Sequence, residues 1–211
     1  MCYHQNLAFT WLNPLYEYSN TSFAFSSDQE AAKLSECKFV HGSVLFMMER
    51  NLDDPDSLQL WKNLCINLIK LATDKDDDVR QFCEPLLMQM MHFFSQPSKI
   101  LSPMTNVMTE CLLISICHYE SSKVQDLSAR LLCEFFSCTN EETNCNQRQA
   151  TSLKLVELFF KMKEMSIETD SSRRICATSA FNNTFQIICK DEALINVYWI
   201  FLLDVFSTNF K

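Results

Sequence analysis

The sequence predicts an all-α protein in which helix pairs stack into an open α-solenoid, and its glycine content, helical periodicity and repeat spacing carry this prediction. Gly42 is the single glycine among 211 residues, whereas average usage of about 7% would give roughly 15. β-Sandwiches, barrels, dinucleotide-binding units and phosphate-binding loops each need several glycines for their turns, so they are disfavoured. Apolar residues make up 47% of the chain, which is enough for a buried core.

The charge balance argues against direct binding to nucleic acid. The chain has 18 Lys plus Arg against 26 Asp plus Glu, a formal net charge of -8. Binding to a phosphate backbone needs clustered cations, and no basic block is present. The close basic pairs Lys161 with Lys163 and Arg173 with Arg174 are interpreted as solvated helix faces.

The cysteines favour a reducing compartment, either cytosol or nucleus. There are 11 of them, an odd number, and most lie in apolar stretches where free thiols pack as small hydrophobes: Cys65, Cys83, Cys111, Cys117, Cys133, Cys176 and Cys189. The N-terminus lacks the pattern of a secretory signal. The longest apolar run, 193–206, is interrupted by Asn196 and Asp204 and is shorter than the roughly 18 residues that a bilayer requires, so no membrane partner is expected.

We expect a poorly defined leading segment over 1–26 and a helical-repeat segment of about four helix pairs over 27–211. Ser27 and Glu30 have capping-box spacing and start a helix that runs to about residue 50. Asp53, Asp54 and Pro55 mark a turn. A second helix over 57–73 places Leu58, Trp61, Cys65, Leu68 and Ala72 on one face.

An acidic connector over 73–78 leads to a helix over 79–95, with Asp78 as its N-cap. Pro85 either kinks this helix or marks a helix that starts at Glu84, because proline lacks the amide hydrogen that would bond Gln81. A linker follows, and Ser102 with Pro103 opens the next helix, to about residue 118.

Ser121 or Ser122 caps a helix to about Cys138, and a polar loop covers 139–147. The helix over 148–165 carries a polar stripe at Lys154, Glu157, Lys161 and Glu164, with Glu157 and Lys161 in the favourable ion-pair order.

Asp170 or Ser171 caps a helix to about Lys190. The final helix, 191–207, is apolar nearly all round, so it must be buried on more than one side. We expect the isolated chain to self-associate through this helix.

The second helices of successive pairs start near 78, 122 and 171, at intervals close to the roughly 40–47 residues of HEAT-type repeats. The second helix of a HEAT unit often opens with Asp, Val and Arg, as in DDVRQF at 77–82. Stacking of HEAT-like pairs is therefore favoured over a closed helical bundle.

No residue of the sequence is assigned a catalytic, cofactor-binding or metal-ligating role. Asp74, Asp76 and Asp78 alternate as in a calcium loop, but Val79 and Pro85 stand where glycine and glutamate are needed. The remaining candidates, interpreted as packed thiols, rim histidines or accidental matches, are Cys117 beside His118, Cys133, Cys138, Cys145, the His118 to Glu120 pair, His41 and His92. No ATP-binding motif appears, so the chain is expected to be a scaffold or binding module without a cofactor.

Three blocks carry a family resemblance: CKFVHGSVLFMM at 37–48, DDVRQFCEPLLMQMMHFFSQ at 77–96 and RRICATSAFNNTFQIICKDEALI at 173–195. They resemble the HEAT region, near the start of the circular cradle, of the DNA-dependent protein kinase catalytic subunits, a branch of the phosphoinositide-kinase-related kinase family. The likeness spans nearly the whole chain and is weak over 97–165. The proline inside EPLLMQMMHFF is its most specific feature.

The resemblance implies a nuclear serine/threonine kinase that the Ku heterodimer recruits to DNA double-strand breaks for non-homologous end joining. The parent would use ATP and Mg in a kinase domain outside these residues. This chain would be a non-catalytic scaffold that contacts the remaining repeats, and no Ku or DNA contact residue is assigned. Two alternatives stay open: a HEAT scaffold of another family, such as a transport receptor or phosphatase scaffold, and a small enzyme with a thiol or metal site.

Overall fold

The computed structural model describes residues 27–50, 52–117, 121–140 and 145–188, together with 195, 196, 198–200, 202, 203 and 207. These residues are helical apart from short connections, and no strand occurs among them. The predicted leading segment, 1–26, lies outside the described residues. The helices are α2 (Ser27–Met48), α3 (Pro55–Leu71), α4 (Asp77–Phe94), α5 (Pro103–Ile116), α6 (Ser122–Asn140), α7 (Cys145–Ser166) and α8 (Ser171–Ile188).

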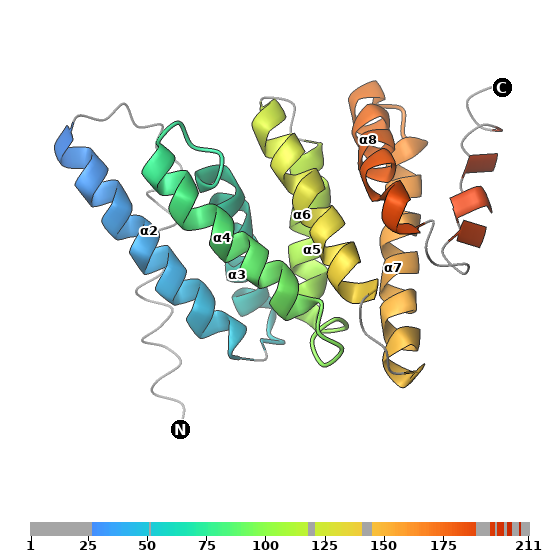
Figure 1. Cartoon of the computed structure of the whole chain (residues 1–211), viewed down its shortest axis with the longest axis horizontal. Coiled ribbons are helices and arrows are strands. Elements are labelled where there is room, and N and C mark those ends of the chain that lie inside the picture. Colours follow the sequence, from blue (N-terminus) through green and yellow to red (C-terminus); the bar gives the residue numbers. More distant parts are fainter. Residues whose placement is uncertain are drawn as a thin grey trace.

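The helices stack in two layers, which confirms the predicted α-solenoid. In one layer α2 contacts α4, α4 contacts α6 and α6 contacts α8. In the other layer α3 contacts α5, and α7 packs across the two layers against α8. Figure 1 shows α2, α4 and α6 side by side in the nearer layer, with α3 and α5 behind them. The second helices start at Asp77, Ser122 and Ser171, within a residue of the predicted positions.

Proline in the first turn defines the start of α3 and α5. Asp54 caps α3 by accepting a hydrogen bond from the Ser57 amide at 2.8 Å, and Ser102 caps α5, as predicted. The predicted turn at Asp53–Pro55 is wrong in one respect, because Pro55 is the first residue of α3. Proline fits there since its missing N–H is one that the first turn leaves unbonded anyway.

The acidic connector caps α4 from an earlier residue than predicted. Asp76, rather than Asp78, is the N-cap, and its carboxylate accepts from the Asp78 amide at 2.9 Å. Asp74 in turn accepts from the Asp76 amide at 3.0 Å. Three alternating aspartates offer equivalent caps, and the one that is used has extended backbone angles.

Helix α4 is continuous through Pro85, so the alternative of a helix that starts at Glu84 is wrong. Both Pro85 and Gln81 are exposed. Water can therefore reach the Gln81 carbonyl, which lacks its usual amide donor. The kink at Pro85 stays a prediction.

A chain of aromatic contacts connects the helices through the core. Trp61 of α3 is fully buried, its indole N–H donates to the Met104 carbonyl at 3.1 Å, and its ring lies 5.5 Å from Phe94 of α4. Further along, Phe159 lies 5.6 Å from Phe136 and 5.4 Å from Phe181. Of the predicted α3 face, Trp61, Cys65, Leu68 and Ala72 are buried, and Leu58 is partly buried.

The predicted polar stripe of α7 is wrong at Lys154. The stripe placed Lys154 with Glu157 and Lys161 on the solvent side, but the Lys154 side chain is buried. Its ammonium donates to Asn106 of α5 at 2.6 Å and to Glu157 of α7 itself at 3.2 Å, so one hydrogen bond to another helix and one within α7 replace water. Glu157 and Lys161 do pair, at 3.0 Å, in the predicted order.

The boundaries of the later helices differ modestly from expectation. Ser121 and Asp170 cap α6 and α8, as predicted. Helix α6 continues to Asn140, and α7 begins at Cys145, so helix occupies both ends of the predicted 139–147 loop.

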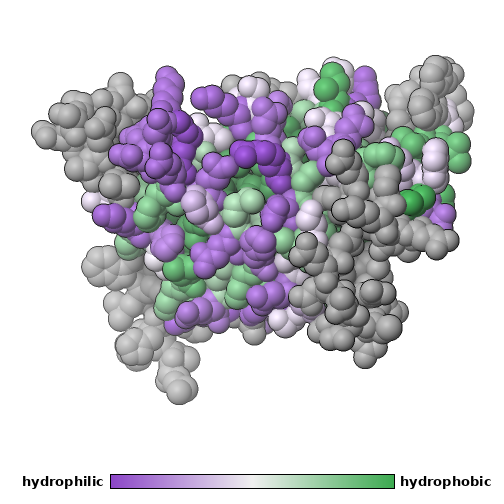
Figure 2. Space-filling view, in the orientation of Figure 1, coloured by the Kyte–Doolittle hydropathy of each residue, from purple (hydrophilic) through white to green (hydrophobic). Residues whose placement is uncertain are grey.

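The described residues of the predicted final helix are helical, while its predicted boundaries at 191 and 207 are not both described. Tyr198 and Leu202 pack against the core, whereas Trp199, Ile200 and Leu203 are exposed. The prediction that the final helix is buried on more than one side is therefore wrong for the face that carries these three residues. Figure 2 shows hydrophobic side chains gathered at this end of the molecule. In the described part of the chain, no helix combines the length and apolar character needed to cross a bilayer.

The side-chain hydrogen bonds between helices join residues that are separated by similar distances along the sequence. Among the described residues, the shortest such separation joins Trp61 to Met104, 43 residues apart, and the longest joins Gln125 to Cys176, 51 residues apart. Lys62 with Glu110 and Lys154 with Asn106 both span 48 residues. Each of these bonds therefore spans about one repeat, as expected where each repeat contacts its neighbours.

Candidate functional site

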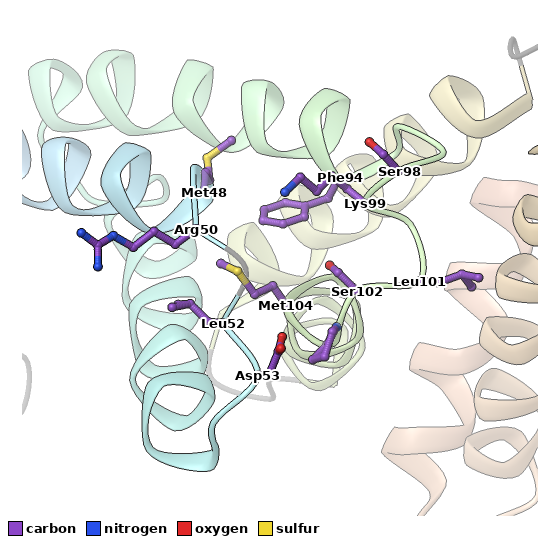
Figure 3. Close-up of a pocket in the computed structure, with 11 residues that line it drawn as sticks. Met48, Arg50, Leu52, Asp53, Phe94, Ser98, Lys99, Leu101, Ser102 and Met104 are labelled. Atoms are coloured by element: carbon purple, nitrogen blue, oxygen red, sulfur yellow. The ribbon is translucent and has the colours of Figure 1, made fainter. Parts of the chain in front are cut away.

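The first surface pocket lies where α2 ends and α5 begins. It has a volume of about 340 Å³ and is lined by residues from the ends of α2 and α4, the connectors that follow them and the start of α5: Met48, Arg50, Leu52, Asp53, Phe94, Ser98, Lys99, Leu101, Ser102, Pro103 and Met104. Figure 3 shows Met48, Phe94 and Met104 gathered at its centre. Lys99 lies 5.4 Å from the centre of the Phe93 ring, a cation–π contact. The pocket thus combines an apolar base with charged rim groups.

The second pocket is a groove that crosses α4, α6 and α8. We call it the α4–α6 groove; its volume is about 450 Å³, and it is lined by Glu84, Met88, Asp126, Leu127, Arg130, Leu131, Cys133, Glu134, Ser137 and Asn183. Arg130 pairs with Glu84 across it at 3.1 Å. Cys133 donates to the Asn183 carbonyl at 2.9 Å. Several of its polar groups therefore already bind one another, as in a contact between neighbouring repeats.

The basic pairs from the sequence take part in local contacts. Lys161 pairs with Glu157, and Arg173 pairs with Glu168 at 2.6 Å. Arg174 donates to the carbonyls of Glu168 and Thr169, both at 2.8 Å, and so fastens the connector between α7 and α8. Lys161, Arg173 and Arg174 therefore take part in contacts within α7 and around the connector to α8.

The cysteines that were interpreted as packed thiols are buried or partly buried where the structure describes them. Burial raises the pKa of Cys117 to about 11, and it also raises the pKa of Cys133 and of Cys176. The pKa of Cys65 is well above its ordinary value because of burial and its contact with Cys111. Thiols of this kind stay protonated near neutral pH and are poor nucleophiles.

Cys138 lies in contact with two polar side chains, one from α4 and one from its own helix. Its sulfur lies 3.2 Å from Nδ1 of His92, and Nε2 of His92 lies 3.2 Å from Oε1 of Glu134. The sulfur is 3.6 Å from the same Glu134 oxygen. His92 is the last-turn residue of α4, whereas Glu134 and Cys138 are one turn apart on α6. We call these three residues the His–Glu–Cys cluster.

The sequence placed His92 on an apolar helical face, but its side chain is 59% exposed. His41 does pack at the rim, with its ring 5.3 Å from that of Phe82. His118 and Glu120 lie outside the described residues, as do Cys189 and the side chain of Cys145. Cys117 contacts Cys176 rather than any described histidine.

Charged side chains also join neighbouring helices of one layer. Lys62 of α3 donates to Glu110 of α5 at 2.9 Å, and this hydrogen bond raises the pKa of Lys62. The described geometry is thus dominated by contacts that hold one repeat against the next.

A family model described as "DNA-dependent protein kinase catalytic subunit, CC1/2" matches residues 55–209, starting at the first residue of α3. Curated relatives named DNA-dependent protein kinase catalytic subunit include one from Canis lupus familiaris, 28% identical over 84% of this chain, and one from Gallus gallus, 26% identical over 88%. A relative of the same name from Dictyostelium discoideum is 20% identical over 84% of the chain. The chain spans only 4–5% of the length of these relatives.

Proposed function

The chain belongs to the family of the CC1/2 region of the DNA-dependent protein kinase catalytic subunit, and we propose that it is a scaffold segment of a serine/threonine kinase of that kind. The observation that carries the proposal is the family match over 55–209, which runs along the stack from α3 onward. Neighbouring repeats in such a stack hold a long, curved surface in place. The segment's role is to position other parts of the kinase and its partners.

The chain itself is non-catalytic in this proposal. The parent kinase uses ATP and Mg at residues outside this chain. The raised thiol pKa values of Cys65, Cys117 and Cys133 support the non-catalytic role, because these side chains are unsuited to nucleophilic attack.

The parent protein acts in the nucleus, in the repair of DNA double-strand breaks by non-homologous end joining. It meets DNA ends together with the Ku heterodimer, and this segment contributes to that assembly through its contacts with other repeats. The acidic balance of the chain, with a formal net charge of -8, supports a protein-contacting role over a direct grip on DNA.

The test uses the cellular protein that contains this chain, carrying an affinity tag. We expect it to accumulate in the nucleus at induced double-strand breaks, to co-purify with Ku, and to phosphorylate serine or threonine in a peptide only when DNA ends and ATP with Mg are present. Purified alone, the 211-residue chain should transfer no phosphate to the same peptide.

A structural variant distinguishes the scaffold role from catalysis. Leu86→Asp places a charge at a position that is 2% exposed and should lower Ku co-purification and end-stimulated activity together. Gln89→Asp, on an exposed position of the same helix, is the matched control and should leave both unchanged. Co-purification with transport cargo or phosphatase subunits, without any response to DNA ends, would identify a HEAT scaffold of another family instead.

A further inference from the structure

We propose that His92, Glu134 and Cys138 bind a divalent ion of the zinc class between α4 and α6. The family relationship assigns no such site, and the inference does not depend on the proposed function. It rests on the only group of three potential ligands within mutual reach among the described residues. One ligand atom from each side chain lies within 4.8 Å of the other two.

The separations within the His–Glu–Cys cluster match those of a tetrahedral site. Zinc bonds of about 2.0–2.3 Å to nitrogen, oxygen and sulfur place neighbouring ligand atoms roughly 3.4–3.6 Å apart. The Cys138 sulfur and the Glu134 oxygen are 3.6 Å apart. The His92 ring approaches each of them to 3.2 Å through a different nitrogen. One nitrogen has to face both partners when an ion binds, and the His92 side chain is 59% exposed, which leaves room for the ring to turn.

The chemistry of the three ligands selects the ion. Imidazole and thiolate together favour zinc over magnesium or calcium, which prefer oxygen ligands. On binding, the Cys138 thiol loses its proton to solvent, and the metal–sulfur bond takes its place. The thiolate and the Glu134 carboxylate then supply two negative charges, which neutralise the two positive charges of the ion.

Helix geometry already orients two of the three ligands. Glu134 and Cys138 are four residues apart on α6, the spacing that places side chains on one face. On the α4 side, the Ser95 hydroxyl donates to the His92 carbonyl at 2.9 Å and so fastens the end of the helix that carries the ring. The ion therefore joins two elements whose positions the fold has fixed.

The site is open to solvent on one side. The His92 side chain is 59% exposed and that of Glu134 is 32% exposed, so an ion can enter and a water can serve as the fourth ligand. Glu134 also lines the α4–α6 groove, so the ion lies beside that groove. A metal at this position ties consecutive repeats together by bonds stronger than the hydrogen bonds between them.

The experiment titrates Co²⁺ and then Zn²⁺ into the reduced 211-residue chain. Tetrahedral Co²⁺ with a thiolate ligand gives visible d–d bands and a sulfur-to-cobalt charge-transfer band, and Zn²⁺ should abolish both by displacing one equivalent of cobalt. Zn²⁺ should also raise the thermal unfolding midpoint, since an ion that binds the folded state stabilises it.

Three ligand variants and one control decide the outcome. His92→Gln, Glu134→Gln and Cys138→Ser should each weaken Zn²⁺ binding by more than the roughly 10–100-fold that loss of an outer partner costs. Cys133→Ser is the control, because Cys133 is a partly buried thiol on the same helix that bonds Asn183 instead. His92→Gln changes an exposed side chain, so circular dichroism should show an unchanged fold.

Two results would overturn the proposal. One is Zn²⁺ binding of equal strength in the wild-type chain and in Cys138→Ser, which would place the metal at other thiols. The other is no cobalt charge-transfer band in the wild-type chain, which would mean that the cluster is a hydrogen-bonded trio without a metal.

Discussion

The ammonium of Lys154 in α7 lies 2.6 Å from the side-chain oxygen of Asn106 in α5, although the two residues are 48 positions apart. Burial lowers the pKa of Lys154, and its hydrogen bond to Glu157 opposes this effect. Asn106 is itself exposed, so one end of the contact is in water and the other is in the core. The pair shows how a buried charge is accommodated between two repeats.

Removing the Asn106 side chain should lower stability substantially only while the buried Lys154 ammonium is present. We expect Asn106→Ala to lower the free energy of unfolding by about 1–3 kcal/mol, because the Lys154 ammonium loses a hydrogen-bond partner. In a Lys154→Met background the same change should cost less than about 0.5 kcal/mol. Urea unfolding of the four proteins gives the coupling as a double-mutant cycle. Equal losses in both backgrounds would contradict the role of this contact.

The Glu157 carboxylate should make stability depend on pH in the acidic range. Burial opposes its ionisation, but hydrogen bonds from Lys161 and Lys154 outweigh burial and lower the pKa of Glu157. Because the folded-state pKa lies below the unfolded one, this contribution is present above about pH 4.5 and is lost as the pH falls through the folded-state pKa.

The measurement compares the wild type with Glu157→Gln by urea unfolding between pH 7 and pH 3. The difference in unfolding free energy should be below about 1 kcal/mol, since the carboxylate is partly exposed, and it should shrink at the acidic end. Glu164→Gln changes an exposed carboxylate of the same helix and serves as the control. A difference that grows as the pH falls would have the wrong sign for this argument.

Leu86 tests the position of α4 in the core. The side chain is 2% exposed, and Leu86→Ala should cost on the order of 2–5 kcal/mol as a large-to-small change in a packed core. Gln89→Ala, on an exposed position of α4, should change stability by less than about 0.5 kcal/mol. Similar effects of the two changes on the urea midpoint would mean that the assigned face of α4 is wrong.

The exposed apolar residues near the C-terminal end should make the chain self-associate. Trp199 is 59% exposed, Ile200 is 61% exposed and Leu203 is 67% exposed. Contiguous apolar surface of this kind is rare on monomers, because contact with another molecule removes it from water. Sedimentation velocity should therefore show a mass that falls on dilution.

The variants Trp199→Glu and Leu203→Glu should reduce this association. Phe160→Glu, which changes an exposed aromatic residue on α7, should leave it unchanged. A wild-type chain that stays monomeric at every concentration would contradict the prediction.

The sequence predicts the helix order well because the helix-start signals are local. Ser102 followed by Pro103 defines the start of α5, and the spacing of second helices near 78, 122 and 171 is present in the chain itself. The choice between Asp76 and Asp78 as a cap could not be made locally, because both carry the same side chain. In the structure Asp76 has the extended backbone angles of a cap, whereas Asp78 is already inside the helix.

Contacts between repeats could not be predicted in the same way. Lys154 shares the polar face of α7 with Glu157 and Lys161, yet it is buried and bonds Asn106 of another helix. The His–Glu–Cys cluster was missed for the same reason, because His92 and Cys138 are 46 residues apart. Known zinc patterns depend on closely spaced ligands, which these helices do not provide. Pairs of polar residues separated by about one repeat length are the sequence signal that could have indicated both the Lys154–Asn106 contact and the His–Glu–Cys cluster.

The hydrogen bonds between helices join residues about one repeat apart in the sequence, and this separation also matters for folding during synthesis at the ribosome. With partners 43–51 residues apart, a nascent helix meets its partner as soon as the next repeat emerges. At translation rates of about 5–20 residues per second, that interval is roughly 2–10 seconds. Each newly made apolar face is therefore exposed only briefly, whatever the length of the polypeptide still to be translated.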